Sequence, residues 1–311
     1  MKNTNQEVLD DVAIQPFRIE AAMVGLEMGD ADVPVLAYLN FLSEQVPIQS
    51  AHCLHVAARF DWFSPLFGKT IEPLAGQYAL SEKVTTAIVE KVRHQLPGLK
   101  STCEVREGDP LEELIKDTEE VDADLIVIGQ KSHADHFGIL AKKLVRKTKC
   151  NALVVPENAK LSLKKILVPI DFSAHSIKAL RTAVAINKRM PAPAEILAVN
   201  VYELPDFASF KISKTQEQFE KLIEEDRLEA FDAFLNTYLT TEDRQHIKKL
   251  LCKKELPGIA NYLLDCAEEQ GADFIVMGAK GHSKVELLLM GSVTERLLTL
   301  NKSIPTLVVK S

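Results

Sequence analysis

The sequence lacks the features that mark several large classes of protein. Lys and Arg number 37 against 44 Asp and Glu, a net charge of −7, so no excess of positive charge favours a nucleic-acid backbone or an anionic membrane as partner. No apolar run approaches the ~20 residues of a membrane span. The start, MKNTNQEVLDD, has neither the basic beginning nor the apolar stretch of a secretion signal. We therefore expect a cytosolic protein that binds neither nucleic acid nor membrane and whose partner is small.

Cysteine is scarce, and no cysteine or histidine cluster has clear metal-site spacing. The five cysteines are odd in number and scattered, with no CxxC pair, which argues against a disulfide framework and a zinc knuckle. We expect reduced thiols, mostly in the core. Alternation along a strand puts Cys53 and His55 on one face and His52 on the other, a poor geometry for one zinc ion. We predict no metal site, with a site shared between this cluster and His133 and His136 as the alternative.

Several catalytic signatures are also missing. There is no GxSxG turn and no cysteine–histidine pair spaced for nucleophilic attack. The HxGH and SGGxD signatures of adenylylating α/β enzymes do not occur, which argues against a transferase or a ligase. The segment 67–70 ends like a Walker A loop but lacks its earlier glycine. The residues give no sign of a dedicated catalytic centre.

What the chain does contain is an internal repeat. Hydrophobic residues make up 46% of 311 residues, which excludes disorder, and at roughly 150 residues per domain the length suggests two domains. Residues 122–133 align with residues 271–282 at an offset of 149, with seven of twelve positions identical. We expect domains over 1–157 and 163–311, joined by the polar, proline-initiated linker 156–162.

The two halves share one order of elements. Residues 22–27 parallel 166–171, and residues 54–56 parallel 199–201. In the second half, short apolar runs alternate with segments of helical period, the pattern of a parallel sheet built from βαβ units. The expected strands are 165–170, 196–201, 245–252, 273–277 and 306–310, and the expected helices are 174–187, a charged segment ending near 238, 259–269 and 293–300. The prediction is two tandem α/β domains, each with a five-stranded, doubly wound, Rossmann-like parallel sheet.

A run of spaced glycines follows the fourth strand of the second half. Gly278, two residues, Gly281, nine residues and then Gly291 and Ser292 lead into a helix. Glycines bring backbone N–H groups close to an oxyanion, and the start of a helix attracts phosphate. Ser292 with Glu295 three residues on also fits a capping box, so a simple helix cap is the alternative.

A carboxylate ends the first strand of the same half. Asp171 follows the strand, and in open α/β sheets ligands bind outside the carboxyl ends of the strands, where such a carboxylate commonly meets ribose hydroxyls. The alternative is that Asp171 caps the helix that begins near Ala174.

This combination resembles the universal stress protein family, in its ATP-binding branch, over the whole chain as two tandem copies. The resemblance implies an adenine nucleotide alpha-hydrolase-like fold. It implies that Asp171 holds the ribose, that Pro169 and the backbone of Val201 meet the adenine, and that Gly281, Ser292 and Val293 meet the phosphates. His282 is either a further donor or structural. The candidate site residues are Pro169, Ile170, Asp171, Val201, Met277, Gly278, Gly281, His282, Gly291, Ser292 and Val293.

The first half departs from this pattern where the ligand would lie. Gly129 is kept, but Ser132 replaces the second glycine, and residues 142–143, two lysines, stand where glycine and serine are required. Glu27 takes the position of the aspartate, and Gly25 that of the proline. We predict that a lysine fills the phosphate space and that this half does not bind ATP in the family manner. We interpret the basic run that begins there as a solvated helix face, with a site for another anion as the alternative.

The resemblance implies a cytosolic universal stress protein whose second domain binds ATP, or AMP, with Mg²⁺, as a regulatory signal in stress. A module that binds no nucleotide and a slow ATPase are the alternatives. In the family the last strands of two domains pair, so residues 151–155 and 306–310 are expected to form a pseudo-dimer within the chain, with a homodimer left open. The polar segment 203–215 is expected to be mobile without ligand.

Overall fold

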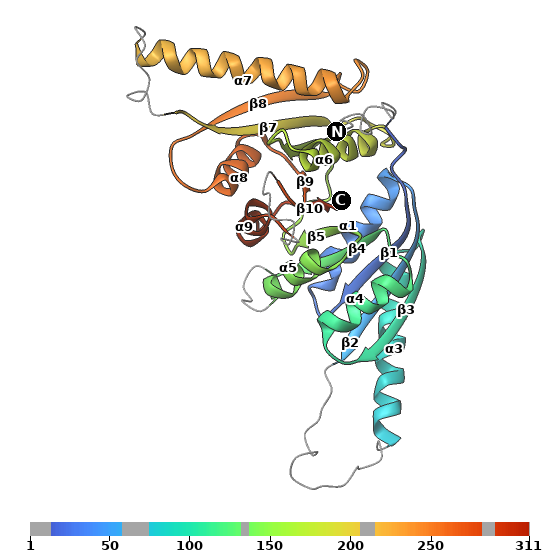
Figure 1. The fold of residues 1–311 in the computed structure, drawn as a ribbon. Coiled ribbons are helices and arrows are strands. Elements are labelled where there is room, and N and C mark those ends of the chain that lie inside the picture. Colours follow the sequence, from blue (N-terminus) through green and yellow to red (C-terminus); the bar gives the residue numbers. More distant parts are fainter. Residues whose placement is uncertain (1–13, 58–74, 132–136, 206–214, 282–289, 311) are drawn as a thin grey trace, which may run out of the picture. The chain divides into compact units, whose positions relative to one another are not determined.

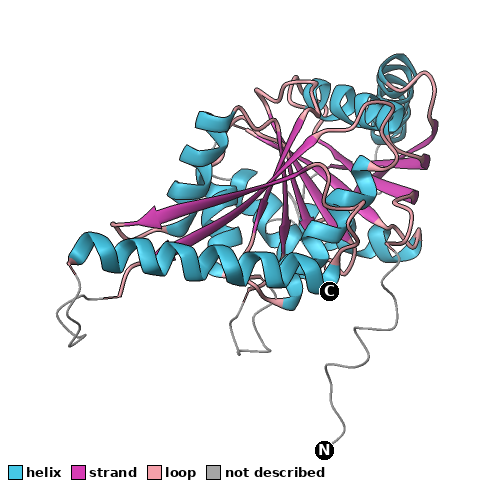
Figure 2. Ribbon diagram, turned by 90° about the horizontal axis from the view of Figure 1, so that it is seen from above, coloured by secondary structure: helices cyan, strands magenta, loops and turns pink. Residues whose placement is uncertain are grey.

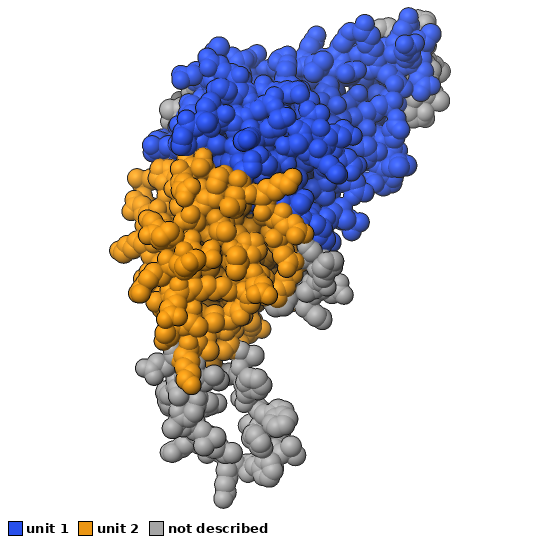
Figure 3. Space-filling model, turned by 180° about the vertical axis from the view of Figure 1, so that it is seen from behind, with its two compact units in different colours: residues 1–17, 162–311 blue, residues 18–161 orange. Residues whose placement is uncertain are grey.

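Each half of the chain folds into an α/β unit of its own, as the repeat predicts. The computed structural model describes residues 14–57, 75–131, 137–205, 215–281 and 290–310. The N-terminal unit comprises residues 18–161, and the C-terminal unit comprises residues 162–311 with residues 1–17 (Figure 3). Among the helices that the structure describes, none is both long and apolar enough to cross a bilayer.

The N-terminal unit contains five parallel strands in the order β3-β2-β1-β4-β5. Its elements are β1 (Ile19–Leu26), α1 (Asp32–Gln45), β2 (Ile48–Ala57), α3 (Ala75–Gln95), β3 (Lys100–Glu107), α4 (Pro110–Glu120), β4 (Leu125–Gln130), α5 (Phe137–Lys147) and β5 (Asn151–Pro156) (Figure 1). Helices α1 and α3 contact each other, as do α4 and α5.

The C-terminal unit repeats this arrangement, with its strands in the order β8-β7-β6-β9-β10. Its elements are β6 (Lys165–Pro169), α6 (Ala174–Asn187), β7 (Glu195–Glu203), α7 (Gln216–Tyr238), β8 (Ile247–Lys254), α8 (Ile259–Gln270), β9 (Phe274–Gly278), α9 (Ser292–Leu300) and β10 (Thr306–Val309). The strands are flanked by helices (Figure 2). The prediction of two five-stranded, Rossmann-like parallel sheets is confirmed.

The central strands are apolar because helices cover both of their faces. Residues 166–168 of β6 and 274–277 of β9 are buried. In each unit the strand order reverses between the first and the fourth strand, at β1/β4 and at β6/β9. A crevice forms at such a switch point, outside the carboxyl ends of the strands, and it is the usual ligand position in open α/β sheets.

One aspartate in each unit ties the start of the first strand to the start of the fourth. The carboxylate of Asp273 accepts hydrogen bonds from the backbone N–H groups of Lys164 and Lys165 at 3.0 Å, and it also accepts the hydroxyl of Ser162. Asp124, its counterpart in the repeat, accepts the N–H of Glu20 at 2.7 Å. Both halves have aspartate at this position because its hydrogen bonds hold the first and fourth strands of each sheet in the same register.

A strained backbone position follows the first strand in both units. Phe172 has φ 63° and Met28, its counterpart, has φ 65°. Left-handed backbone is costly for residues with a side chain and persists only where the surroundings impose it. The ring of Phe172 packs edge-on against Phe231 and Phe234, with centroids 5.6 and 5.3 Å apart, which holds this turn in place.

Candidate functional site

A cavity of about 210 Å³, open to solvent, lies at the switch point of the C-terminal unit. Its walls come from the carboxyl ends of β6, β7 and β9, from the loop after β9, and from the starts of α8 and α9. The lining residues are Pro169, Ile170, Asp171, Ser176, Val199, Val201, Ile259, Leu263, Met277, Gly278, Lys280, Gly281, Gly291, Ser292, Val293 and Thr294.

The start of α9 forms the polar end of this cavity. Gly291 is the N-cap, and no side chain caps the helix, so the capping-box alternative for Ser292 is wrong. The N–H groups in the first turn of a helix have no carbonyl partner within the helix. Those of Ser292 and Val293 are therefore available, and the helix dipole favours an anion there.

The glycines let the loop after β9 lie directly against this helix start. The N–H of Gly291 donates to the carbonyl of Ala279 at 2.7 Å, and the hydroxyl of Thr294 donates to the carbonyl of Gly278 at 3.0 Å. A Cβ added to Gly291 would lie 3.4 Å from the Cα of Lys280. The spacing that the sequence shows thus serves close backbone approach.

Asp171 stands across the cavity from α9. Its carboxylate accepts the N–H of Ser173 at 3.0 Å, while Ser173 itself is the N-cap of α6. Asp171 therefore supports the turn but is not the helix cap. A Cβ added to Gly281 would lie only 2.6 Å from Asp171 Oδ2, so the glycine loop reaches this carboxylate with no room for a side chain.

A histidine that sequence reasoning missed borders the same loop. A Cβ added to Gly278 would lie 2.9 Å from both the Cβ and the carbonyl oxygen of His175, the second residue of α6. Burial lowers the pKa of His175, the nearby Lys280 ammonium lowers it further, and Asp171 opposes the shift. The neutral imidazole is favoured, and Lys280 supplies the positive charge at the cavity.

Comparison with known proteins decides the family. The model of the universal stress protein family matches residues 49–156 and again residues 162–310, more than half of the chain. The chain belongs to the universal stress protein family. Universal stress protein MJ0531 of Methanocaldococcus jannaschii is 33% identical over 148 residues, which cover 47% of this chain and 82% of that protein. Universal stress protein MJ0577 of the same organism is 30% identical over 162 residues, covering 47% and 94% of the two chains.

Solved structures agree on the fold over nearly the whole chain. A universal stress protein from Archaeoglobus fulgidus superposes with a TM-score of 0.61 at 18% identity, covering 93% of this chain and 96% of that one. At this identity the likeness concerns the fold alone. It supports the description of the chain as a tandem universal stress protein with two adenine nucleotide alpha-hydrolase-like units.

Ten of the eleven predicted site residues line this cavity of the C-terminal unit, and the eleventh, His282, lies outside the described residues. The sequence analysis did not include six further lining residues: Ser176, Val199, Ile259, Leu263, Lys280 and Thr294. Alternation with Val201 could have identified Val199, and Ile259 and Leu263 are four apart on one face of α8. Their role toward a ligand is taken up below.

The N-terminal unit also has a cavity at its switch point, of about 170 Å³. The prediction that a lysine fills it is wrong. Helix α5 begins at Phe137, so Lys142 and Lys143 lie inside the helix and not at its start, and neither lines the cavity. The side chain of Leu140, one turn earlier, lines it instead.

Cys53 and His55 each have partners of their own and do not converge on one point. His55 Nδ1 bonds to the carbonyl of Leu26 at 3.0 Å, and Cys53 is buried beside Cys103, whose hydrogen bond raises the pKa of the Cys53 thiol. His52 faces a different group of residues, as alternation predicts. His133 and His136 lie outside the described residues.

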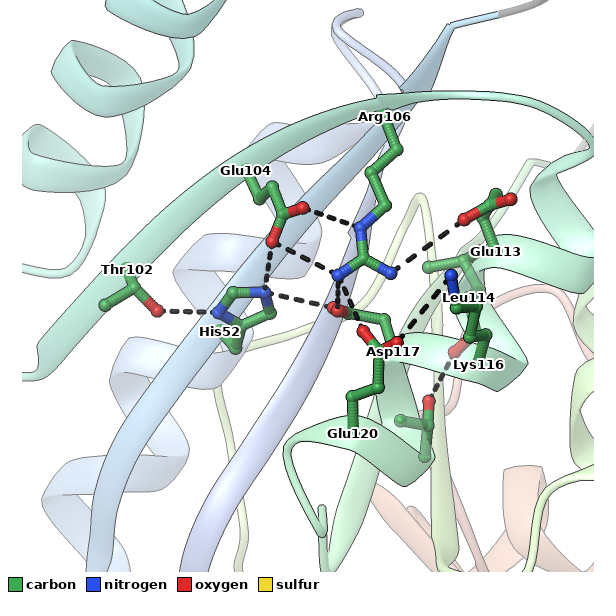
Figure 4. Close-up of polar contacts among 10 residues, drawn as sticks. His52, Thr102, Glu104, Arg106, Glu113, Leu114, Lys116, Asp117 and Glu120 are labelled. Carbon is green, nitrogen blue, oxygen red and sulfur yellow. Dashed lines mark hydrogen bonds and ion pairs between the residues drawn. The ribbon is translucent and has the colours of Figure 1, made fainter.

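His52 joins an ion network between β2, β3 and α4 (Figure 4). Its Nε2 lies 3.0 Å from Asp117 Oδ2 and 3.6 Å from Glu104 Oε2, and Arg106 Nη2 lies 2.6 Å from Asp117 Oδ1. Burial raises the pKa of Asp117, against the effect of His52 and Arg106. The His52 imidazole and the carboxylates of Glu104 and Asp117 lie close enough together to hold a metal ion. The Arg106 guanidinium already pairs with both carboxylates, so we interpret the cluster as structural.

Proposed function

We propose that the C-terminal unit binds an adenine nucleotide, ATP or AMP, and that the protein acts in the cytosol as a nucleotide-dependent signal in stress. One observation carries this proposal. The uncapped start of α9 and the glycine loop face a cavity whose other walls are mainly apolar, with Asp171 and Ser176 as the polar residues among them. A ligand that fits both ends has an anionic group and an apolar ring, which is the chemistry of a nucleotide.

Each end of the cavity has a separate part in this binding. The N–H groups and the hydroxyl at the start of α9, with the Lys280 ammonium, would hold the phosphates. Val199, Val201 and Leu263 would enclose the base, and the Asp171 carboxylate would accept a sugar hydroxyl.

The residues also fit the Mg²⁺ that accompanies ATP. Magnesium binds through one or two protein oxygens together with phosphate oxygens and water. The Asp171 carboxylate and the Ser292 hydroxyl are oxygens that this cavity offers. When bound, the ion would neutralise phosphate charge.

Binding without rapid turnover follows from the same set of residues. Among the described residues that line the cavity, Asp171 is the one carboxylate, and it accepts the backbone N–H of Ser173. Hydrolysis needs a group that orients and deprotonates water at the terminal phosphate. We expect ATP to be held, with hydrolysis slow at most.

Calorimetric titration of the full chain with ATP tests the proposal. We expect one site per chain. The variant that carries Gly291→Lys and Ser292→Lys together should lose it, because two lysine side chains occupy the helix start. The reciprocal variant, Lys142→Gly with Lys143→Ser, is the matched control. It should gain no second site, because those positions lie inside α5.

The two alternatives give different results in the same titration. A module that binds no nucleotide shows no heat and no thermal stabilisation, whereas a ligand at ~100 times its dissociation constant stabilises by roughly 2.7 kcal/mol. A slow ATPase binds once but releases ADP and phosphate on incubation. Two sites per chain would contradict the account of the N-terminal unit.

A further inference from the structure

The cavity of the N-terminal unit has the position of a ligand site but not the chemistry of the C-terminal one. It lies at the carboxyl ends of β1, β2 and β4, and its volume, about 170 Å³, is close to the 210 Å³ of its counterpart. Among the described residues that line it, Glu27, Asp32 and His55 are polar, and the rest are apolar side chains, alanine or glycine. What it binds must follow from these differences.

The helix start that would hold an anion in the C-terminal unit has no equivalent at the matching sequence position of the N-terminal unit. In the C-terminal unit α9 begins at Ser292, whereas in the N-terminal unit the helix already runs through the matching position, Lys143. The N–H groups there are bonded within α5 and are not available. The start of α4 is occupied too, because the Asp109 carboxylate accepts the N–H groups of Leu111 and Glu112 at 3.0 Å.

The charge of Lys131, at the mouth of the cavity, is neutralised by Glu27, whose side chain is longer than that of its counterpart Asp171. Lys131 and Lys280 are counterparts in the repeat, but Lys280 lines its cavity and Lys131 does not. Lys131 Nζ lies 2.6 Å from Glu27 Oε2, and Glu27 stands where the C-terminal unit has the shorter Asp171. This pairing raises the pKa of Lys131 and holds its charge against the carboxylate.

The second acid of this cavity is neutralised as well. Asp32, 2% exposed, accepts the Lys91 ammonium at 2.8 Å through one oxygen and the N–H of Glu27 at 2.8 Å through the other. The wall charges therefore cancel in two ion pairs. A buried ligand with a net charge would lose its hydration and meet no unpaired charge in return.

His55 lines the cavity, and one of its two ring nitrogens has a partner among the described residues. Its Nδ1 bonds to the carbonyl oxygen of Leu26, which can only accept, so the hydrogen is on Nδ1. In the neutral ring Nε2 is then an acceptor, and no hydrogen bond to it occurs among the described residues. A ligand meets this nitrogen, and the Glu27 carboxylate at the mouth, with a donor of its own.

We propose that the N-terminal cavity binds an uncharged, largely apolar molecule that carries a hydroxyl or amino donor, and that it excludes phosphorylated and carboxylate ligands. The proposal does not depend on nucleotide binding in the C-terminal unit. It gives the N-terminal half a ligand of its own, in a cavity where the phosphate-binding features are replaced by apolar side chains and compensated charges.

Fluorescence of Nile red, an uncharged apolar dye, tests this in the full chain. Competitors are used in matched pairs: 1-octanol against octyl phosphate, and adenosine against AMP. We expect saturable dye binding and displacement by an uncharged member at a concentration about tenfold or more below that of its phosphorylated partner, because a buried phosphate has no partner here. Displacement of the dye by 1-octanol would indicate an alkyl ligand, and displacement by adenosine would indicate a nucleoside.

Matched variants assign the dye to one cavity. Val56→Trp should abolish binding because the ring fills the N-terminal cavity, and Val201→Trp, its counterpart in the repeat, should leave that site intact. If Val56→Trp loses its cooperative unfolding transition, Leu140→Trp replaces it. Equal displacement by the phosphorylated partners, displacement by neither uncharged competitor, or binding that survives both N-terminal variants would overturn the proposal.

Discussion

Gly278 and Gly129 occupy the same position at the end of the fourth strand, and alanine at these positions should have unequal costs. A Cβ at Gly278 would lie 2.9 Å from the carbonyl oxygen and the Cβ of His175. A Cβ at Gly129 would lie 2.9 Å from a terminal methyl of Val35 and 3.7 Å from the nearest backbone oxygen. The first contact involves helix backbone that cannot move alone, and the second involves a side chain that can rotate.

The magnitudes follow from these two contacts. Overpacking against backbone costs about 1–3 kcal/mol. Moving a side chain off its preferred rotamer costs about 0.5–1.5 kcal/mol. Neither glycine has a positive φ, so alanine also gains about 0.4–1 kcal/mol through the unfolded state. We expect Gly278→Ala to destabilise clearly and Gly129→Ala to have a small net effect.

Scanning calorimetry and urea denaturation of both variants check this prediction. For chains of 150–250 residues, 1 kcal/mol shifts Tm by about 2–4 °C, so a net cost of up to about 2.6 kcal/mol should lower the transition of Gly278→Ala by up to about 10 °C. Gly98→Ala, with no atom within 4 Å of the new Cβ, is the control and should be neutral or stabilising. Equal losses at Gly278 and Gly129 would refute the reasoning from backbone contact.

Three further changes test other parts of the account. Asp273→Ala should cost about 1.5–3 kcal/mol in urea denaturation, because two backbone N–H groups lose a charged acceptor; an unchanged midpoint would contradict this. Asp109→Ala should cost about 0.5–2 kcal/mol through the lost N-cap of α4, with Asp109→Ser restoring most of it. Burial opposes ionisation of Asp243, but Lys188 and the Thr240 hydroxyl outweigh it and lower its pKa, so its ionised form stabilises the fold above the unfolded pKa of about 3.9. The stability difference between the parent and Asp243→Asn should therefore shrink as pH falls from 5 toward 2, and a constant difference over that range would contradict the shift.

The sequence predicts the sheets and the polar end of the C-terminal cavity because their signals are local. Helix α6 has the predicted bounds, 174–187, the glycines at 278 and 291 mark where backbone approaches backbone, and Gly281 marks where the loop approaches the Asp171 carboxylate. Alternating apolar runs and glycine spacing are patterns of residues close together in the chain, so a single sequence is enough to recognise them.

The features that the sequence does not predict depend on contacts between distant residues. Helix α5 begins at Phe137, before the position that matches the start of α9, and the cavity of the N-terminal unit differs for this reason. The lysines at 142 and 143 do not indicate this earlier start. The network of His52, Glu104 and Asp117 brings together two strands and a helix more than ten residues apart in the chain. No spacing rule connects such residues before the fold is known.

The most direct test of the central claim is to denature the purified protein and to identify and count any nucleotide that it releases. The account predicts one adenine nucleotide per chain in the parent and none in the variant with Gly291→Lys and Ser292→Lys. A parent that releases none and shows no thermal shift with added ATP would contradict nucleotide binding at the start of α9.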